Sequence, residues 1–316
     1  FEAMIIGGCL VGTAIDKLDL TGALIQERGA QSIAYSLHPG LDYNATRMRE
    51  LVLADTHLGT FGAGHLSNGV ARNRHLEVLD ISGCELSDVA AAHIARMLVP
   101  QGDHFQSQLS TLVLARNPFG PRGVQLIAEA LAVLPGKATN TALTALDLSG
   151  CNAGADGVFA VAQMLRNNQH LTLVTLDKNT LMEDAKGHTV MDALHALSEA
   201  LPHNVSLQTL SLKGNSLTTA ALQNLIPGVV QNFGLKTLDL RENLVGMQYA
   251  VCKEMLDRLN ANTSLSRLDL GSNPVGHGVM AAIQERERKL SAPPPTNTAL
   301  MMQPKGSKGS KGTLQT

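Results

Sequence analysis

The sequence predicts an α/β solenoid, in which about nine strand–helix units stack into one parallel sheet covered by a layer of helices. Three observations favour this class. A leucine motif recurs nine times at spacings of 28 to 36 residues, and a fixed period of this size is typical of stacked repeats. Within each copy the leucines alternate as in a strand, and the residues that follow have helical spacing.

The motif has the form Leu-x-x-Leu-x-Leu-x-x-(Asn or Cys)-x-Leu. Counted at the first residue of its Leu-x-Leu pair, the copies lie at Leu18, Leu51, Leu79, Leu112, Leu146, Val174, Leu210, Leu238 and Leu268. The first two copies are weaker, with Ala23 and Thr56 at the Asn position. A short polar side chain at that position can hydrogen-bond the backbone where the chain leaves the strand.

Each motif is followed by apolar residues three and four apart, which predict a helix. The clearest sets are Val124, Ile127, Leu131 and Leu134, then Val158, Val161 and Leu165, and Leu222, Leu225 and Val229. One strand–helix unit cannot bury its apolar face alone, so the units must stack. We therefore expect a curved parallel sheet on the concave side and helices on the convex side.

This pattern resembles the ribonuclease-inhibitor-like class of leucine-rich repeats, which has repeats of about 28 residues with a full helix in each. The resemblance covers residues 14–290 and implies a horseshoe-shaped solenoid. Residues 1–13 are expected to be an N-terminal cap or the end of an upstream repeat. Residues 291–316 form a tail rich in Pro, Gly, Ser and Lys, a composition that cannot bury enough apolar surface to fold alone.

Composition limits the kinds of partner and the compartment. The net charge is −2, so no global field favours nucleic acid or a membrane surface, and no apolar run reaches the roughly 18 residues of a membrane span. Cys84 and Cys151 stand at the Asn position two strands apart, about 9–10 Å, which exceeds the Cα separation of a disulfide. Free thiols favour a reducing, intracellular site: cytoplasm, cytoskeleton or cilium, or a mitochondrion after loss of a presequence before Phe1.

The sequence shows no catalytic set, cofactor motif or metal-ligand motif. Four residues on one expected helix face, His188, Asp192, His195 and Glu199, have spacings of 4, 3 and 4. A zinc site needs three or four converging ligands, and the chain lacks the His-Glu-x-x-His and Cys-x-x-Cys pairs that supply them. We therefore expect no metal there but a solvated or partner-facing helix.

The strand face offers the main candidate contact surface. Its variable positions are mostly small in the first repeats and charged in repeats six to eight, at Asp177, Lys178, Lys213, Asp239, Arg241 and Glu242. We predict that these charges contact a protein partner. The alternative is that they bind nothing, because Leu-Asp-Leu is common in this class. A second candidate is the apolar cluster of the tail, Leu300, Met301 and Met302.

These features together predict a non-enzymatic protein-interaction scaffold, a subunit of a larger ciliary, cytoskeletal or organellar assembly. We expect several protein partners and no cofactor, membrane, specific nucleic acid or small-molecule substrate. Two alternatives remain. The family includes Ran GTPase-activating proteins, so the chain could regulate a small GTPase, with Arg116 and Asn117 as the residues to test. It could also be the sensor region of an immune receptor.

Overall fold

The computed structural model describes residues 9–10, 13–37, 47–100, 107–133, 136, 138–183, 191–246 and 249–291, without the side chains of residues 249 and 252. The predicted tail contacts Leu300, Met301 and Met302 lie outside these residues, as do His188 and Leu134. The division into residues 1–13, 14–290 and 291–316 stays a prediction for the same reason.

Nine short strands form one parallel sheet whose order follows the sequence. The strands are β1 (Lys17–Asp19), β2 (Glu50–Val52), β3 (Val78–Asp80), β4 (Thr111–Val113), β5 (Ala145–Asp147), β6 (Leu173–Thr175), β7 (Thr209–Ser211), β8 (Thr237–Asp239) and β9 (Arg267–Asp269). Each strand is centred on the residue at which its motif was counted, and these nine residues pair in one continuous register. The predicted repeat frame is therefore confirmed in all nine copies.

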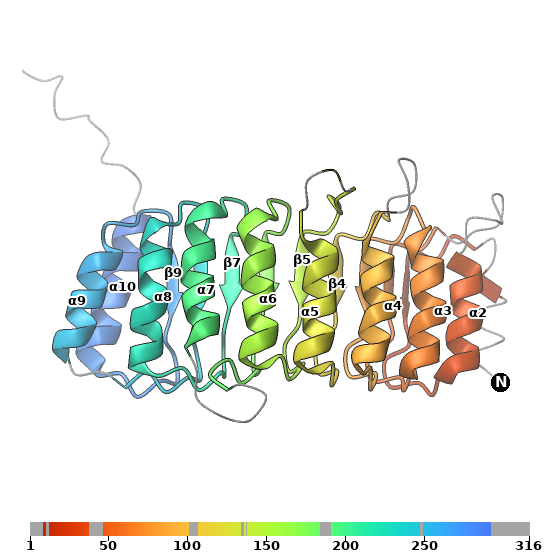
Figure 1. The fold of residues 1–316 in the computed structure, drawn as a ribbon, viewed down its shortest axis with the longest axis horizontal. Coiled ribbons are helices and arrows are strands. Elements are labelled where there is room, and N and C mark those ends of the chain that lie inside the picture. The colour runs from red at the N-terminus through yellow and green to blue at the C-terminus, as the bar shows by residue number, and fades with distance from the viewer. Residues whose placement is uncertain are drawn as a thin grey trace, which may run out of the picture.

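A row of helices covers one face of this sheet (Figure 1). The helices are α2 (Gln26–Leu37), α3 (Gly59–Ala71), α4 (Asp88–Leu98), α5 (Gly120–Leu131), α6 (Gly154–Asn167), α7 (Asp192–Ala200), α8 (Thr219–Gln231), α9 (Tyr249–Leu259) and α10 (His277–Ser291), with a 3₁₀ turn at Leu201–His203. The two layers define a helix face and a strand face, the predicted convex and concave sides. Among the described residues, no helix is long and apolar enough to cross a bilayer.

The hydrophobic core lies between the two layers and runs along the whole array. The leucines of the motif and the helical apolar residues meet there, and both Leu146 and Val158 have an exposed fraction of 0%. Leu18 is only partly buried, because β1 is the outermost strand of the sheet in the part of the chain that the structure describes. Each repeat thus buries its apolar surface mainly against its two neighbours, as the stacking argument requires.

The Asn position links successive repeats by hydrogen bonds. Asn117 donates from Nδ2 to the carbonyl oxygens of Ile81 (2.9 Å) and Leu114 (2.8 Å), and its Oδ1 accepts from the amides of Cys84 and Leu86. Asn179, Asn215 and Asn243 make equivalent bonds in later repeats. Thr56 and Cys84 supply only the donor of this pattern: the Thr56 hydroxyl and the Cys84 thiol each donate to the carbonyl oxygen of Leu53. The predicted role of this position is confirmed.

A second row of buried asparagines was not predicted. It consists of Asn73, Asn140, Asn168, Asn204, Asn232 and Asn262, each between a helix and the next strand. Asn232 is typical: its Nδ2 donates to the carbonyl of Leu201 in the preceding repeat, and its Oδ1 accepts from the amide of Leu235. A net hydrogen bond contributes about 1 kcal/mol to folding stability. The two rows of asparagines therefore stabilise the fold substantially, in addition to the packing of the core.

The side chain of Arg286 on α10 takes over this role beyond the last asparagine of the row. It is 6% exposed, and its guanidinium donates to the carbonyl oxygens of Leu265 (2.7 Å) and Asn262 (2.8 Å). The next residue, Glu287, accepts a hydrogen bond of 2.9 Å from the amide of Leu268 in β9. These two residues bind α10 to the last strand.

The residue four positions after each strand centre adopts a left-handed backbone. These nine residues have φ between 54° and 73°: Gly22, Asp55, Gly83, Arg116, Gly150, Lys178, Gly214, Glu242 and Ser272. Glycine adopts this conformation without strain, whereas other residues pay about 1–2 kcal/mol. Charged residues and glycines alternate along most of the row, so a long side chain has an open position beside it.

Candidate functional site

The strand-face patch consists of the six charged residues predicted as a contact surface: Asp177, Lys178, Lys213, Asp239, Arg241 and Glu242. They lie in β8 or just after β6, β7 and β8. The structure brings them together, because those three strands are neighbours in the sheet. Their role in binding stays a prediction.

The two aspartates of the strand-face patch hold the turns that follow the strands. Asp239 Oδ1 accepts from the amide of Arg241 (3.0 Å), as the aspartates at the same position do in several other repeats. Repeat seven has Ser211 at this position. The amide of Lys213 there donates to Asp177 of the preceding repeat (3.0 Å), which also accepts from the Ser211 hydroxyl. These carboxylates are therefore structural whether or not they also bind a partner.

Most of the remaining charges pair within the surface. Lys213 Nζ lies 2.9 Å from Glu242 Oε1, and Arg241 Nη2 lies 2.6 Å from Asp239 Oδ2. Lys178 is exposed and makes no ion pair among the described residues. Among the described residues, the patch therefore offers one unpaired cation, Lys178. Beside it lie ion pairs whose members could pair with charges of a partner instead.

Burial and these bonds act differently on the carboxylates of the patch. Burial raises the pKa of Asp177 above its ordinary value, although the hydrogen bonds from Ser211 and Lys213 oppose it. Burial acts on Asp239 too, but the bonds from Arg241 outweigh it, so the pKa of Asp239 is lowered. The hydrogen bond from Lys213 lowers the pKa of Glu242. Such charged groups can recognise a partner through ion pairs and hydrogen bonds.

Two charged residues extend the patch and were not predicted. Arg267 begins β9, and its Nη2 lies 3.2 Å from Asp269 Oδ2 on the same strand. Asp269 also lies 3.7 Å from Arg241 Nε. The signal was present in the sequence, because Asp269 repeats the position that Asp239 occupies one strand earlier.

The residues named for a GTPase regulator are not both accessible. Asn117 has an exposed fraction of 0%, and its amide group is engaged in the hydrogen-bond row described above. The proposal that it could act at a bound nucleotide is therefore wrong. The Arg116 side chain is 59% exposed and pairs with Asp55 at 3.0 Å.

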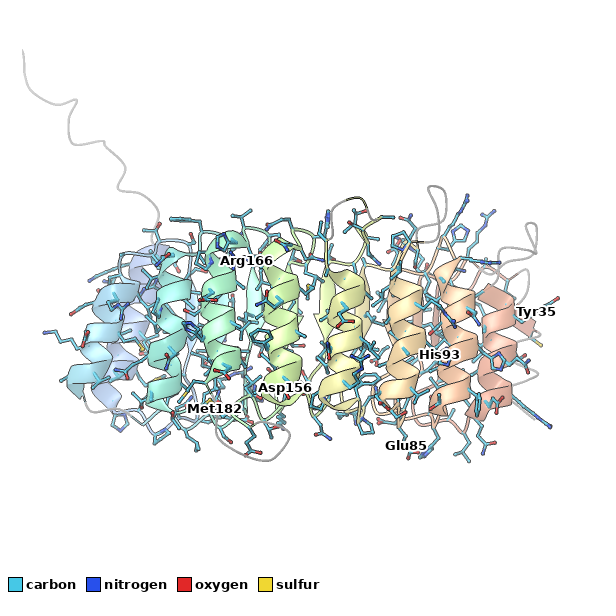
Figure 2. All side chains as sticks on the ribbon, viewed as in Figure 1. Tyr35, Glu85, His93, Asp156, Arg166 and Met182 are labelled. Carbon is cyan, nitrogen blue, oxygen red and sulfur yellow. The ribbon has the colours of Figure 1, made fainter. Side chains whose placement is uncertain are left out.

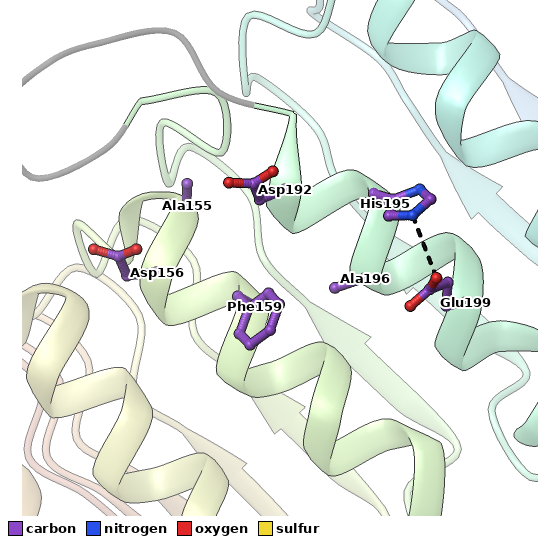
Figure 3. A pocket seen from close by; sticks show the side chains of 7 residues that line it. All are labelled: Ala155, Asp156, Phe159, Asp192, His195, Ala196 and Glu199. Atoms are coloured by element: carbon purple, nitrogen blue, oxygen red, sulfur yellow. Dashed lines mark ion pairs between the residues drawn. The ribbon is translucent and has the colours of Figure 1, made fainter.

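The helix-face group predicted to be solvated or partner-facing is exposed. His195 Nε2 lies 3.3 Å from Glu199 Oε1, and their side chains are 68% and 57% exposed. With Asp192 they line one wall of a pocket of about 480 Å³ between α6 and α7 (Figure 3). The part of the chain that the structure describes contains no group of three or more His, Cys, Asp or Glu residues that could hold a metal ion. His188 lies outside that part.

Two of the cysteines belong to the core. Cys84 and Cys151 are free and buried, as predicted from their spacing in the sheet. Burial raises the pKa of Cys84, and it raises the pKa of Cys151 to about 12. Both thiols are therefore protonated at neutral pH and inert as nucleophiles.

Comparisons with known proteins agree with the repeat assignment. A family described as Leucine Rich repeat matches residues 72–95 and 139–162. NACHT, LRR and PYD domains-containing protein 5 of Bos taurus is 27% identical over 88% of this chain and 23% of its own length. The ribonuclease inhibitor of Sus scrofa is 27% identical over 66% of this chain and 42% of its own length. Centrosomal protein of 78 kDa of Mus musculus is 26% identical over 59% of this chain and 24% of its own.

These matches agree with the fold, which is that of a leucine-rich repeat solenoid. The similarity to the ribonuclease inhibitor supports the ribonuclease-inhibitor-like class that the motif indicated. The chain spans less than half the length of each of these relatives. The similarity supports the repeat architecture, and function must be argued from the surfaces that this chain presents.

Proposed function

We propose that this chain is a non-enzymatic protein-interaction scaffold whose strand-face patch contacts a partner protein. The observation that carries the proposal is the gathering of six charged residues over β6, β7 and β8. Lys178, Arg241 and Glu242 are exposed, and Lys178 makes no ion pair among the described residues. Charges on a sheet are set at fixed spacings by the strand register. Such a surface can be complementary to one partner and exclude others.

The assembly proposed for the scaffold is intracellular, in the cytoplasm or a cytoskeletal, ciliary or mitochondrial complex with several partners. The similarity to a centrosomal protein supports the cytoskeletal setting. The repeat fold supports the scaffold role, since it exposes a large surface relative to its core. Tail residues Leu300, Met301 and Met302 are proposed as a second contact.

A triple substitution tests the strand-face patch. Tagged wild-type protein and the Lys178→Ala, Lys213→Ala, Arg241→Ala variant would be used to purify partners from the native cell extract. Each co-purified protein would be quantified relative to the bait. We expect at least one partner recovered with wild type to fall about tenfold, since several interface charges are lost together.

The control removes the same charge from the helix face, through Arg122→Ala, Arg166→Ala and Lys253→Ala. This variant should retain the partner. Equal loss with both triple variants, or loss with neither, would contradict the proposal. Circular dichroism of both variants would verify that the fold is intact.

A second candidate is the sensor region of an immune receptor. The observation that favours it is the match to a protein that combines leucine-rich repeats with NACHT and PYD domains, which covers 88% of this chain. A scaffold should co-purify the same partners in constant proportion in resting and stimulated cells. A sensor region should recover a partner only after stimulation, so the same purification separates the two.

A further inference from the structure

The pocket between α6 and α7 has an aromatic wall and an acidic lining. Phe159 projects from α6, and Asp192, His195, Ala196 and Glu199 lie on α7 (Figure 3). Ala155 and Asp156 at the start of α6 complete the lining. None of these seven described lining residues is a lysine or arginine.

Phe159 stands where no other repeat has a Phe, Tyr or Trp side chain; α9 has Val251 there and α10 has Ala281. Phe159 directly follows Val158, a buried residue that lies twelve positions after the strand centre Leu146, as Val124 lies twelve after Leu112. The equivalent residues are Gln31 in α2, Gly64 in α3, Ala92 in α4, Gln125 in α5, His195 in α7 and Gln223 in α8. Repeat stacking therefore does not require an aromatic side chain here. Phe159 is 44% exposed, and exposed aromatic rings are typical anchors of protein contacts.

Two carboxylates of the pocket lack partners in the described structure. Asp156 lies in the first turn of α6 and Asp192 in the first turn of α7. Neither side-chain carboxylate makes a hydrogen bond or an ion pair with another described residue. Asp156 lies at the opposite end of α6 from Arg166 (Figure 2). Glu199 pairs with His195 at 3.3 Å. A cation in the pocket could contact either of these carboxylates without first breaking an ion pair.

We propose that this pocket binds an arginine side chain presented by a basic segment of a partner protein. A guanidinium can stack on the ring of Phe159 and donate to a carboxylate in the plane of its N–H groups. Arginine fits better than lysine, because its charge is planar, delocalised and weakly hydrated. The site lies on the helix face, so it does not depend on the strand-face patch.

A first-turn aspartate also interacts favourably with the dipole of its own helix, and this alone could account for Asp156 and Asp192. That explanation leaves the ring of Phe159 without a role. It also predicts that first-turn acids elsewhere on the helix face, Glu27 in α2 and Asp88 in α4, are equivalent to this pair. The two explanations therefore differ in a measurable way.

The test uses a fluorescein-labelled peptide of alternating arginine and glycine, with its binding followed by fluorescence anisotropy. The comparison peptides carry citrulline or lysine at every arginine position. Citrulline keeps the shape of the side chain and removes its charge. We expect the full chain to bind the arginine peptide at least about fivefold more tightly than either comparison peptide.

Three variants assign the binding to the pocket. Phe159→Gln introduces the side chain found at the same position of α5 and α8, so the repeat should fold normally. This variant and the double variant Asp156→Asn, Asp192→Asn should each weaken arginine-peptide binding at least about threefold. The matched control, Glu27→Gln with Asp88→Asn, removes two first-turn acids elsewhere and should bind as wild type does.

Several results would overturn the proposal. These are equal binding of the arginine and citrulline peptides, equal binding of the lysine peptide, absence of binding, or equal weakening in the control variant. The strand-face triple variant should bind the arginine peptide normally, so failure of that surface and failure of this pocket are distinguishable.

Discussion

Asp55 and Arg116 form an ion pair of 3.0 Å across Gly83, although 61 residues separate them in the sequence. All three residues have the left-handed backbone that follows each strand. The glycine between the two charged residues leaves the space through which their side chains meet. A Cβ atom on Gly83 would lie 1.9 Å from Asp55 Oδ1.

Gly83→Ala should therefore break this ion pair, because the Asp55 carboxylate must rotate away from the added Cβ. The loss of stability should be about 1–2 kcal/mol, the left-handed strain plus the small contribution of an exposed ion pair. Chemical denaturation followed by circular dichroism measures the loss. Gly22→Ala is the matched control, because Gly22 has φ of 73° and nothing within 4 Å of an added Cβ. It should cost only the backbone strain, about 1 kcal/mol. Equal losses in the two variants would contradict the role given to Gly83.

Asn117→Ala should destabilise the protein by about 2–4 kcal/mol, because it leaves buried backbone groups of repeats three and four without partners. Loss of the unfolding free energy would be measured in urea. Asn224→Ala removes an exposed asparagine whose amide bonds within its own helix, so it should change stability by less than about 0.5 kcal/mol. The assignment of Asn117 to a structural role would be wrong if the two variants were equally stable.

Asp177 should make stability depend on pH. Burial raises its pKa in the folded state above the ordinary 3.8, so the folded protein holds this proton to a higher pH than the unfolded chain does. Ionisation of Asp177 therefore costs stability as the pH rises through that window. Asp177→Asn cannot ionise and keeps an oxygen acceptor for Ser211 and Lys213. We expect the stability of this variant relative to wild type to increase between acidic and neutral pH.

Asp239→Asn supplies a control of opposite sign, measured by thermal unfolding across the same pH series. The pKa of Asp239 is lowered, so its stabilising contribution is present at neutral pH and is lost as the pH falls through the folded pKa. This variant should lose stability relative to wild type as the pH rises. Parallel curves for the two variants would refute the electrostatic assignment.

Arg286→Leu should loosen the last repeat more than the rest of the array, because solenoids unfold by local units. The substitution removes the hydrogen bonds to Leu265 and Asn262 and leaves their carbonyls buried. Hydrogen exchange should accelerate in α9, β9 and α10, while α5 and α6 remain protected. Arg288→Leu, which removes an exposed side chain paired with Glu285, should leave all these rates unchanged. Uniform acceleration across the chain would exclude a local role for Arg286.

Sequence periodicity was sufficient to predict the repeat frame. The motif gave the centre of every strand, since an alternating pattern with one buried side has a single favourable register. The second asparagine row could have been found from the same sequence. In six repeats an asparagine lies three residues before the first leucine of the motif, as Asn232 does before Leu235.

The surface contacts were less accessible to sequence reasoning. The Asp55–Arg116 pair depends on the backbone conformation of three successive repeats. Comparing the residue types at one position of the repeat does not reveal that conformation. Asn117 was named for the GTPase hypothesis although it stands at the Asn position that was also expected to bond the backbone, and its complete burial decides for the structural role. The α6–α7 pocket requires knowing that Phe159 and His195 occupy equivalent places on adjacent helices.

The bond between Glu287 and the amide of Leu268 also bears on aggregation. The outermost strand of a sheet exposes backbone donors that can recruit a strand from another molecule. Here one such donor on β9 is already occupied, and a carboxylate stands where an incoming chain would approach. Adding a foreign strand would require breaking this bond and burying a charge. This bond and this charge would therefore oppose end-to-end growth at β9, the outermost strand of the described sheet.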